Sequence, residues 1–139
     1  MKRNPLTDIM TPNPLTVTLD DSLAKVKDLM AKHDFRHLPV VSGEELVGII
    51  SQNDILRLSF GNHFAEQETG ESTLLDLMST EEVMTSNPVS IAVKCTVGEV
   101  AHLLVRANYH AVPVVEGTRL VGMVTTTDLI RYFLEQMGD

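Results

Sequence analysis

An internal repeat is the feature that most constrains the fold of this chain. When the sequence is aligned with itself at a shift of 74 positions, residues 10–60 match residues 84–134 without a gap. The identical pairs include Met10/Met84, Thr11/Thr85, Asn13/Asn87, Pro14/Pro88, Pro39/Pro113, Gly48/Gly122, Asp54/Asp128 and Arg57/Arg131. Such a match indicates two copies of one structural unit. We therefore expect a first repeat in residues 1–60, a linker in 61–78 and a second repeat in 79–139.

Each copy predicts the same order of elements, β-α-β-β-α. A short β-rich segment, PLTVTL or PVSIAV, precedes a helix whose apolar residues recur at helical spacing. Asp21 or Ser22 and Thr96 are the expected N-caps. Two apolar runs around a polar turn, GEE or GTR, predict a β-hairpin, and a closing helix is expected from about Asn53 and about Thr127. The predicted fold class is α/β (α+β), with two tandem repeats packed about a pseudo-two-fold axis.

Composition narrows the classes of function. Apolar residues make up 43% of the 139 residues, which is enough for a packed core, and the net charge of −8 argues against binding to nucleic acid or to an anionic membrane. Cys95 is the only cysteine, so no internal disulfide can form. The N-terminal residues lack the apolar core of a signal peptide, and no run approaches 18 apolar residues. These features predict a cytoplasmic protein.

A hydroxyl residue and a carboxylate, three positions apart, recur at the two expected junctions between the hairpin and the closing helix. The pairs are Ser51 with Asp54 and Thr125 with Asp128. Both pairs suit helix capping, and both also suit a carboxylate that accepts hydrogen bonds from ribose hydroxyls. The two roles are compatible, and both interpretations stay open at this point. One helical turn later each copy has an arginine, which predicts an ion pair within the helix.

Catalytic and metal-binding patterns are not found in the sequence. It has no G-x-S-x-G elbow, no G-x-x-x-x-G-K-[ST] loop and no G-x-G-x-x-G. His33 and His37 are four apart, but Asp34 is expected to end the helix between them, which disfavours a shared metal site. We therefore expect no catalytic residue, no metal site and no enzymatic activity.

Taken together, the motifs resemble a tandem pair of cystathionine-β-synthase (CBS) domains, the Bateman module. The matching segments are IMTPNPLTV and VMTSNPVSI, then RHLPVV and HAVPVV, then LVGIISQND and LVGMVTTTD. The resemblance implies a regulatory module that binds an adenosine-containing ligand, AMP, ADP, ATP or S-adenosylmethionine, in clefts between the repeats. It also implies a homodimer. No enzyme, channel or transporter is attached within these residues, so we expect a stand-alone regulator that signals to an unidentified effector protein.

The same resemblance implies which residues contact the ligand, with Mg²⁺ as a companion ion if the ligand is a polyphosphate. They are Thr16, Val17, Arg36, Pro39, Ser51, Asp54, Ser90, Ile91, His110, Pro113, Thr125 and Asp128. In this set the first strand of one repeat joins the carboxylate of the other, so Thr16 and Val17 join Asp128.

Arg36 and His110 occupy equivalent positions, three before a proline, and the resemblance makes them phosphate contacts. A guanidinium fork suits phosphate oxygens, and an imidazole adds a donor. The alternative is a solvated surface cation and an ordinary histidine at a strand edge.

Two rival functions remain. One is a dimerisation module that binds no ligand. The other is a small nucleotide hydrolase, which the missing nucleophile, metal set and phosphate loop disfavour.

Overall fold

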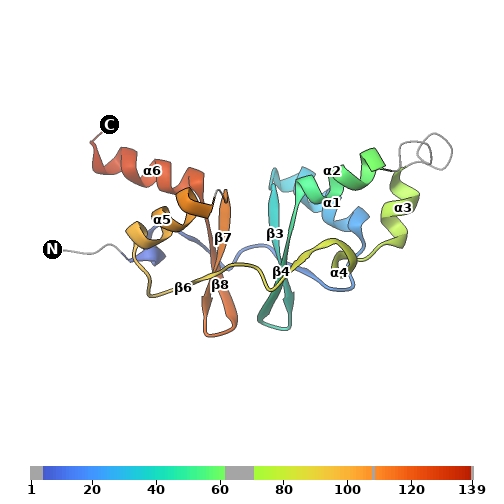
Figure 1. The fold of residues 1–139 in the computed structure, drawn as a ribbon, viewed down its shortest axis with the longest axis horizontal. Helices are drawn as coiled ribbons and strands as arrows, with labels where there is room; N and C mark the ends of the chain where they lie inside the picture. The colour runs from blue at the N-terminus through green and yellow to red at the C-terminus, as the bar shows by residue number, and fades with distance from the viewer. Residues whose placement is uncertain (1–4, 62–70, 108, 139) are drawn as a thin grey trace. The chain divides into compact units, whose positions relative to one another are not determined.

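The computed structural model describes residues 5–61, 71–107 and 109–138, and it has a mixed α/β fold (Figure 1). The chain forms two compact units. Unit 1 combines Met1–Pro14 with Val89–Asp139, and unit 2 is Leu15–Pro88. Unit 2 is therefore inserted into unit 1, and the chain passes from one unit to the other after Pro14 and after Pro88. Each compact unit joins the body of one sequence repeat to the first residues of the other.

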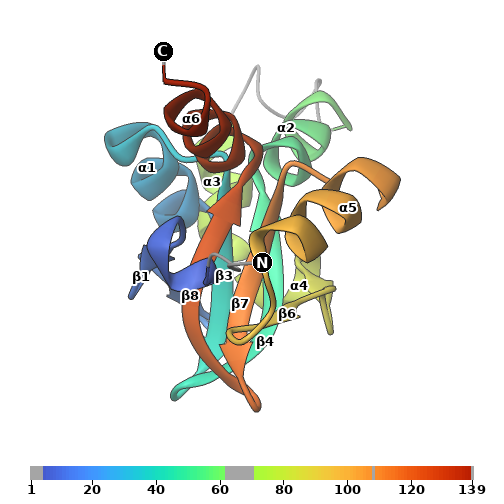
Figure 2. The same ribbon diagram turned by 90° about the vertical axis from the view of Figure 1, so that its left-hand side faces the viewer.

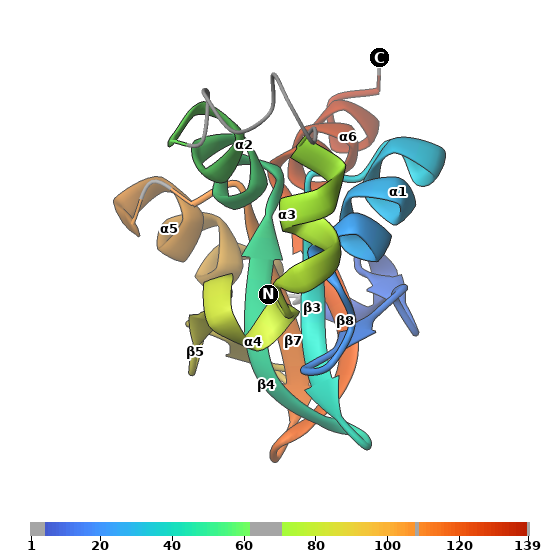
Figure 3. The same ribbon diagram turned by 90° about the vertical axis from the view of Figure 1, so that its right-hand side faces the viewer.

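Unit 2 contains most of the first repeat. Its elements are β2 (Val17–Thr18), α1 (Leu23–His33), β3 (His37–Ser42), β4 (Glu45–Ser51), α2 (Gln52–Gly61), α3 (Glu71–Leu77), α4 (Thr80–Val83) and β5 (Thr85–Ser86). Strand β2 runs parallel to β3, β3 pairs antiparallel with β4, and β4 pairs antiparallel with β5. Figure 3 shows α1, α2 and α3 on the same face of the β3–β4 hairpin.

Unit 1 repeats this arrangement. Its elements are η1 (Leu6–Asp8), β1 (Thr11–Pro12), β6 (Ile91–Ala92), α5 (Val97–Ala107), β7 (Ala111–Glu116), β8 (Arg119–Thr125) and α6 (Thr126–Gln136). Strand β6 runs parallel to β7, and β8 pairs antiparallel with β7 on one side and with β1 on the other. Helices α5 and α6 lie on the same face of the β7–β8 hairpin (Figure 2).

Helices α1 and α5 begin at the predicted N-caps, and α1 ends where the sequence predicts. The Ser22 hydroxyl accepts a hydrogen bond from the Lys25 N–H at 3.1 Å, so Ser22 is the N-cap of α1. The hydroxyl of Thr96 caps α5 in the same way, from the Glu99 N–H at 3.2 Å. Helix α1 stops at Asp34, whose left-handed backbone (φ 57°) cannot continue an α-helix.

Each unit has its own aliphatic core between the helices and the hairpin. In unit 2 the buried members are Val17, Leu23, Val26, Met30, Leu38, Val40, Ile50, Ile55 and Leu75. In unit 1 they are Leu6, Ile91, Val97, Val100, Leu104, Val112, Val114, Val124 and Leu129. No buried member of either cluster is aromatic, and every buried member except Met30 of unit 2 is a branched aliphatic residue, so such side chains fill most of the space between sheet and helices.

Two short arms, residues 5–14 and 79–88, add strands that the sequence did not predict. Strand β1 pairs with β8, and β5 pairs with β4. A glycine in the hairpin permits each approach. A Cβ on Gly122 would lie 2.5 Å from the Met10 sulfur, and a Cβ on Gly48 would lie 2.4 Å from the Met84 sulfur. The repeated glycine and methionine are therefore two sides of one close contact.

An asparagine in each arm completes its docking. Asn13 and Asn87 adopt left-handed backbone angles, with φ of 46° and 50°. Their N–H groups donate to the carbonyls of Val121 and Val47, in both cases at 3.2 Å. Asparagine tolerates this conformation better than most residues, which explains why it recurs before the proline in both copies.

The predicted β-α-β-β-α order and the α+β class are confirmed, and the closing helices begin at Gln52 and Thr126, one residue earlier than expected. Of the expected linker, residues 62–70 lie outside the described residues, whereas Glu71–Leu77 forms α3. Within the described ranges, no helix has the length and apolar character needed to cross a membrane.

Candidate functional site

The hydroxyl–carboxylate pair of unit 2 lies where β4 passes into α2. The Ser51 N–H donates to Oδ2 of Asp54 at 2.8 Å, and the Asp54 N–H donates to the Ser51 hydroxyl at 3.1 Å. Arg57, one turn further along the helix, donates to Oδ1 of the same carboxylate. The predicted helix cap and the predicted ion pair are both present.

Unit 1 has the same arrangement where β8 passes into α6. The Thr125 N–H donates to Oδ2 of Asp128 at 2.9 Å, and the Asp128 N–H donates to the Thr125 hydroxyl at 3.1 Å. Arg131 reaches Oδ1 of Asp128 at 3.5 Å. The two junctions therefore hold their carboxylates in the same orientation, although the arginine is closer in unit 2.

Capping does not exhaust what these carboxylates can bind. An ionised carboxylate has about four lone-pair directions, and the backbone N–H and the arginine occupy two of them. The side chains of Asp54 and Asp128 are 11% and 13% exposed. Because the cap fixes the orientation of each carboxylate, the remaining lone pairs are available to hydroxyl donors at little further cost in side-chain entropy.

Arg36 and His110 are tied to these junctions through their backbones. The Arg36 carbonyl accepts from the N–H of Gln52 at 2.8 Å, and the His110 carbonyl accepts from the N–H of Thr126 at 2.9 Å. The sequence analysis did not predict these two backbone hydrogen bonds. The only related feature that it predicted was the start of each closing helix. Both side chains are exposed, and among the described residues neither forms an ion pair. Each unit therefore offers a capped carboxylate with an available polar side chain close to it in the fold.

The first-strand residues divide into core and surface. Val17 is 1% exposed and Ile91 is 9% exposed, and both side chains lie in the hydrophobic core of their own unit. Only their backbone groups are therefore open to a ligand. Thr16 is half-buried and Ser90 is exposed, so their hydroxyls are the polar side chains of this segment.

Pro39 and Pro113 occupy the middle of β3 and β7. Their strand neighbours Leu38 and Val40, or Val112 and Val114, belong to the core clusters. Because side chains alternate along a strand, both prolines lie on the sheet face opposite their unit's core.

The predicted site residues are brought together within each unit. Unit 2 brings Arg36, Ser51 and Asp54 to one junction, and unit 1 does the same with the equivalent residues. The grouping of Thr16 and Val17 with Asp128, across the repeats, stays a prediction.

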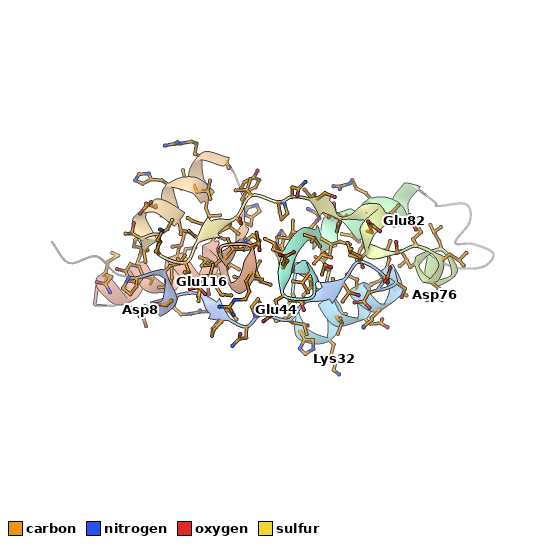
Figure 4. All side chains as sticks on the ribbon, turned by 90° about the horizontal axis from the view of Figure 1, so that it is seen from below. Asp8, Lys32, Glu44, Asp76, Glu82 and Glu116 are labelled. Carbon is orange, nitrogen blue, oxygen red and sulfur yellow. The ribbon has the colours of Figure 1, made fainter. Side chains whose placement is uncertain are left out.

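Charge is distributed unequally between the units. Unit 2 contains thirteen acidic and five basic residues, a net charge of −8, whereas unit 1 contains six of each. The whole net charge of the chain therefore belongs to unit 2. The acidic side chains come from several elements, as Glu44 in the β3–β4 turn, Asp76 in α3 and Glu82 in α4 illustrate (Figure 4).

Metal ligation has no candidate in the described part of the chain. Across residues 5–61, 71–107 and 109–138, no three His, Cys, Asp or Glu side chains gather in a way that could hold an ion. Cys95 is a half-buried free thiol.

Comparison with known proteins decides the family. The sequence profile of the CBS domain matches residues 6–61 and again residues 81–135. The chain belongs to the CBS-domain family. A CBS domain-containing protein of Dictyostelium discoideum is 34% identical over 126 residues, which are 88% of this chain and 86% of that protein.

Other relatives are longer than this CBS pair. An uncharacterized protein of Methanocaldococcus jannaschii is 31% identical over 129 residues, and the chain covers 46% of its length. The inosine-5′-monophosphate dehydrogenase of Korarchaeum cryptofilum is 29% identical over 116 residues, and the chain covers 21% of it. The CBS pair therefore spans less than half of these two relatives.

Solved structures share the fold of the pair over nearly its whole length. CBSX2 of Arabidopsis thaliana, in complex with AMP, is 25% identical with a TM-score of 0.80, covering 96% of this chain and 98% of CBSX2. The CBS domain pair of protein MJ0100, in complex with 5′-methylthioadenosine and S-adenosylmethionine, is 29% identical with a TM-score of 0.76, covering 97% of this chain and 99% of that one.

Proposed function

We propose that this CBS pair is a non-enzymatic regulatory module that binds an adenosine-containing ligand and passes the signal to an effector protein in the cytoplasm. The observation that carries the proposal is the duplicated junction. There the helix cap fixes the carboxylates of Asp54 and Asp128, and each carboxylate keeps lone pairs that can accept further hydrogen bonds. The bound AMP of CBSX2 and the bound adenosyl compounds of the MJ0100 pair support this ligand class. The candidates are AMP, ADP, ATP and S-adenosylmethionine.

Each carboxylate is proposed to accept the hydroxyls of a ribose. A carboxylate that accepts two hydroxyl hydrogen bonds distinguishes a nucleoside from a free base or a free phosphate. Arg36 and His110 are proposed to face the phosphate or the equivalent group of the ligand. With the ligand bound, the relative stability of two arrangements of the module changes by no more than the difference in their affinities for that ligand.

The proposal is tested by calorimetric titration of AMP and S-adenosylmethionine into four proteins: wild type, Asp54→Ala, Asp128→Ala and Asp76→Ala. Loss of a carboxylate that binds ribose is expected to cost about 1.5–3 kcal/mol at the affected site, because hydrogen bonds to charged groups are the stronger class. Asp76 is an exposed carboxylate on α3 and provides the matched control, for which unchanged binding is expected.

Capping and binding are separated by comparing stability with affinity. Asp54→Asn and Asp128→Asn keep an oxygen that can accept the backbone N–H, so they are expected to lose less thermal stability than the alanine variants while still losing affinity. If all four variants lose stability and none loses affinity for either ligand, the carboxylates are caps only and the ribose assignment is wrong.

The rival functions give different results in the same preparations. A ligand-free dimerisation module shows no thermal shift with any adenosine compound, whereas a ligand that binds the folded form raises stability by RT ln(1 + [L]/Kd). A nucleotide hydrolase converts ATP to product during incubation, and the proposed module leaves it intact.

A homodimer is part of the proposal, and the exposed face of α6 supports it. Ile130, Phe133, Leu134 and Met137 recur at the spacing of one helix face and are 45–70% exposed. An apolar stripe of this kind is typical of a surface that a second helix covers. Light scattering at micromolar concentration is expected to give twice the mass of the chain, and a monomer would contradict this part of the proposal.

A further inference from the structure

The arm of residues 5–14 docks on unit 1 as a separate piece of chain. Strand β1 pairs antiparallel with β8, with Thr11 opposite Met123 and Pro12 opposite Gly122. Leu6 is fully buried in the unit 1 core, and Pro5 forms a β-bridge with Thr96. The arm therefore supplies both a strand and a core side chain to a unit whose other residues begin only at position 89.

The arm of residues 79–88 docks on unit 2 with matching contacts. Strand β5 pairs antiparallel with β4, with Thr85 opposite Ile49 and Ser86 opposite Gly48. The backbone carbonyls of Thr85 and Thr11 both lie 3.0 Å from the Cβ position of the glycine that they face. Each hairpin thus has a docking site, called here the seat, for a Met-Thr-x-Asn-Pro segment. The seat is formed by the bare glycine and by the carbonyl of the residue directly before it, Val121 or Val47.

The two arms differ in how the chain connects them to their seats. The second arm lies within the continuous segment Leu15–Pro88, which contains its own seat. The first arm is joined through Pro14 and Leu15 to unit 2, and all of unit 2 separates it along the chain from β8. No short stretch of chain therefore requires that the arm on a given β7–β8 hairpin belong to the same molecule.

We propose that the seat on β8 is an interaction surface for a second copy of this chain, which inserts its own residues 5–14 there. Reciprocal exchange of the arms then links two copies. Every contact of the arm is kept, because the incoming arm is identical to the one it replaces. This link is separate from the helix-mediated homodimer proposed above, and neither proposal requires the other.

The stiffness of the arm lowers the entropy cost of docking it, on its own hairpin or on the hairpin of a second copy. Pro12 and Pro14 fix two backbone angles, and Asn13 between them is left-handed in the docked state. A released arm therefore gains less conformational entropy than a glycine-rich tether would gain. Since no contact is added, concentration decides between the two states. An intrachain arm has an effective concentration on the order of millimolar for a short tether, so exchange is expected chiefly when the protein is refolded at high concentration.

Disulfide trapping in the full chain tests the proposal. In a Cys95→Ser background, chains carrying only Thr11→Cys are mixed with chains of different mass carrying only Met123→Cys, unfolded together and refolded in a glutathione buffer. Directly opposed residues of an antiparallel pair are close enough for a disulfide. The expected product is a covalent heterodimer, seen by mass spectrometry without reductant, whose yield rises with protein concentration.

The matched control uses the internal arm. Chains with only Thr85→Cys and chains with only Ile49→Cys have the same pairing in unit 2, but their arm and seat are part of one continuous segment. They are expected to give little heterodimer. The double variant Thr11→Cys/Met123→Cys reports whether the bond can form within one chain. If the mixed chains give no more heterodimer than the control pair while the double variant cross-links internally, arm exchange is excluded.

A second measurement does not depend on disulfide geometry. Chains of two masses, one carrying an isotope label and both carrying photo-reactive methionine in place of methionine, are refolded together and irradiated. Mass spectrometry then identifies the links between arm and hairpin, since Met10 and Met84 lie against the hairpin glycines. Mixed-mass links between residues 5–14 and β8, more abundant than mixed-mass links between residues 79–88 and β4, are the expected result. Equal abundance, or no mixed-mass links at all, would overturn the proposal.

Discussion

Unit 1 and unit 2 stabilise the start of their equivalent helices, α5 and α1, with different residues. In unit 2 the Asp21 carboxylate accepts from the Thr18 N–H at 2.8 Å and from the Lys25 ammonium at 3.1 Å, beside the Ser22 cap of α1. Cys95 stands at the position of Asp21 in unit 1. There Glu99 replaces Lys25, and its carboxylate accepts from the Thr96 N–H at 3.2 Å. Both units place one carboxylate at the start of the helix, but from opposite ends of the first turn.

The two arms also differ in one buried residue, which is polar in unit 2 and apolar in unit 1. Thr80 is fully buried in unit 2, and its hydroxyl and N–H both donate to the Asp21 carbonyl at 2.8 Å. The equivalent residue of unit 1, Leu6, is also fully buried, but it packs in the hydrophobic core. A buried hydroxyl is tolerated in unit 2 because a carbonyl satisfies it, and none is needed in unit 1.

The comparison separates what the fold needs from what each unit adds. The hairpin glycines, the arm methionines, the left-handed asparagines and the capped carboxylates are the same in both units. The helix anchors, the buried arm residue, Arg36 against His110 and the net charge all differ. Identical positions belong to the shared architecture, and differing positions are where the two units can acquire separate properties.

The largest expected effect on stability comes from replacing the hairpin glycine on which an arm docks, a residue that is identical in both units. Gly122→Val and Gly48→Val place a side chain against the methionine sulfur and against a threonine carbonyl 3.0 Å from the Cβ. Because a backbone carbonyl cannot turn away as a flexible side chain can, we expect each variant to lose roughly 3 kcal/mol of unfolding free energy, the upper end of overpacking costs. Chemical denaturation of both variants measures it.

Gly98 provides the control for this prediction. It lies in α5, and the nearest atom to its Cβ position is 3.9 Å away. Gly98→Ala is expected to raise stability by about 0.5–1 kcal/mol, because alanine is the better helix former. If the two valine variants cost no more than a few tenths of a kcal/mol, the arms do not seat on the glycines as described.

The arms also show where sequence reasoning stops. The long elements were predictable, because α1 and the hairpin strands carry regular apolar spacing, and Ser22 and Thr96 are residues that cap helices. Strands β1 and β5 have two residues each, too few for a period, and they pair with the hairpin of another part of the chain. The available signal was the recurrence of Gly48 and Gly122, since a glycine inside a strand often marks a close approach of another backbone.

The candidate site was predictable to a similar degree. The spacing of Ser51 and Asp54 predicts both a cap and a ligand-binding carboxylate, and the cap is confirmed. The two-residue strand β2 gave no basis for deciding which way Val17 points, and its side chain lies in the core. The tie between the Arg36 carbonyl and the Gln52 N–H depends on tertiary pairing, which no local pattern encodes.

The second prediction sharpens the contrast between Arg36 and His110. If Arg36 grips phosphate, Arg36→Ala is expected to weaken AMP binding by about 10- to 100-fold, or roughly 1.5–3 kcal/mol, while adenosine loses little. His110→Arg makes unit 1 resemble unit 2 and is expected to strengthen AMP binding, because guanidinium binds phosphate bidentately. Calorimetric titration of both ligands into the three proteins measures this.

Adenosine distinguishes a phosphate contact from a structural role. Equal losses for AMP and adenosine in Arg36→Ala would mean that Arg36 supports the fold of its unit. No loss for either ligand would make it a solvated surface cation, whose contribution to binding is close to zero.

The smallest expected effect concerns the Asp21 carboxylate of unit 2, whose position is occupied by Cys95 in unit 1. Burial opposes ionisation of Asp21, but the Thr18 N–H and the Lys25 ammonium outweigh it and hold the pKa of this carboxyl below its ordinary value of 3.8. A carboxyl whose pKa is lowered by folding stabilises the folded chain above its unfolded pKa, and this stabilisation is lost as the pH falls through the folded pKa. Asp21→Asn keeps an oxygen for the Thr18 N–H and removes only the charge, so it is expected to cost about 1 kcal/mol near pH 7.

Thermal unfolding over a range of pH measures this effect. The stabilities of wild type and variant should differ by a constant amount above about pH 5, and the two should converge as the pH falls below 3.8. Cys95→Ala, at the equivalent position of unit 1, should show no such convergence, and a wild-type-to-Asp21→Asn difference that stays the same in acid would contradict the anchoring role of the Asp21 charge.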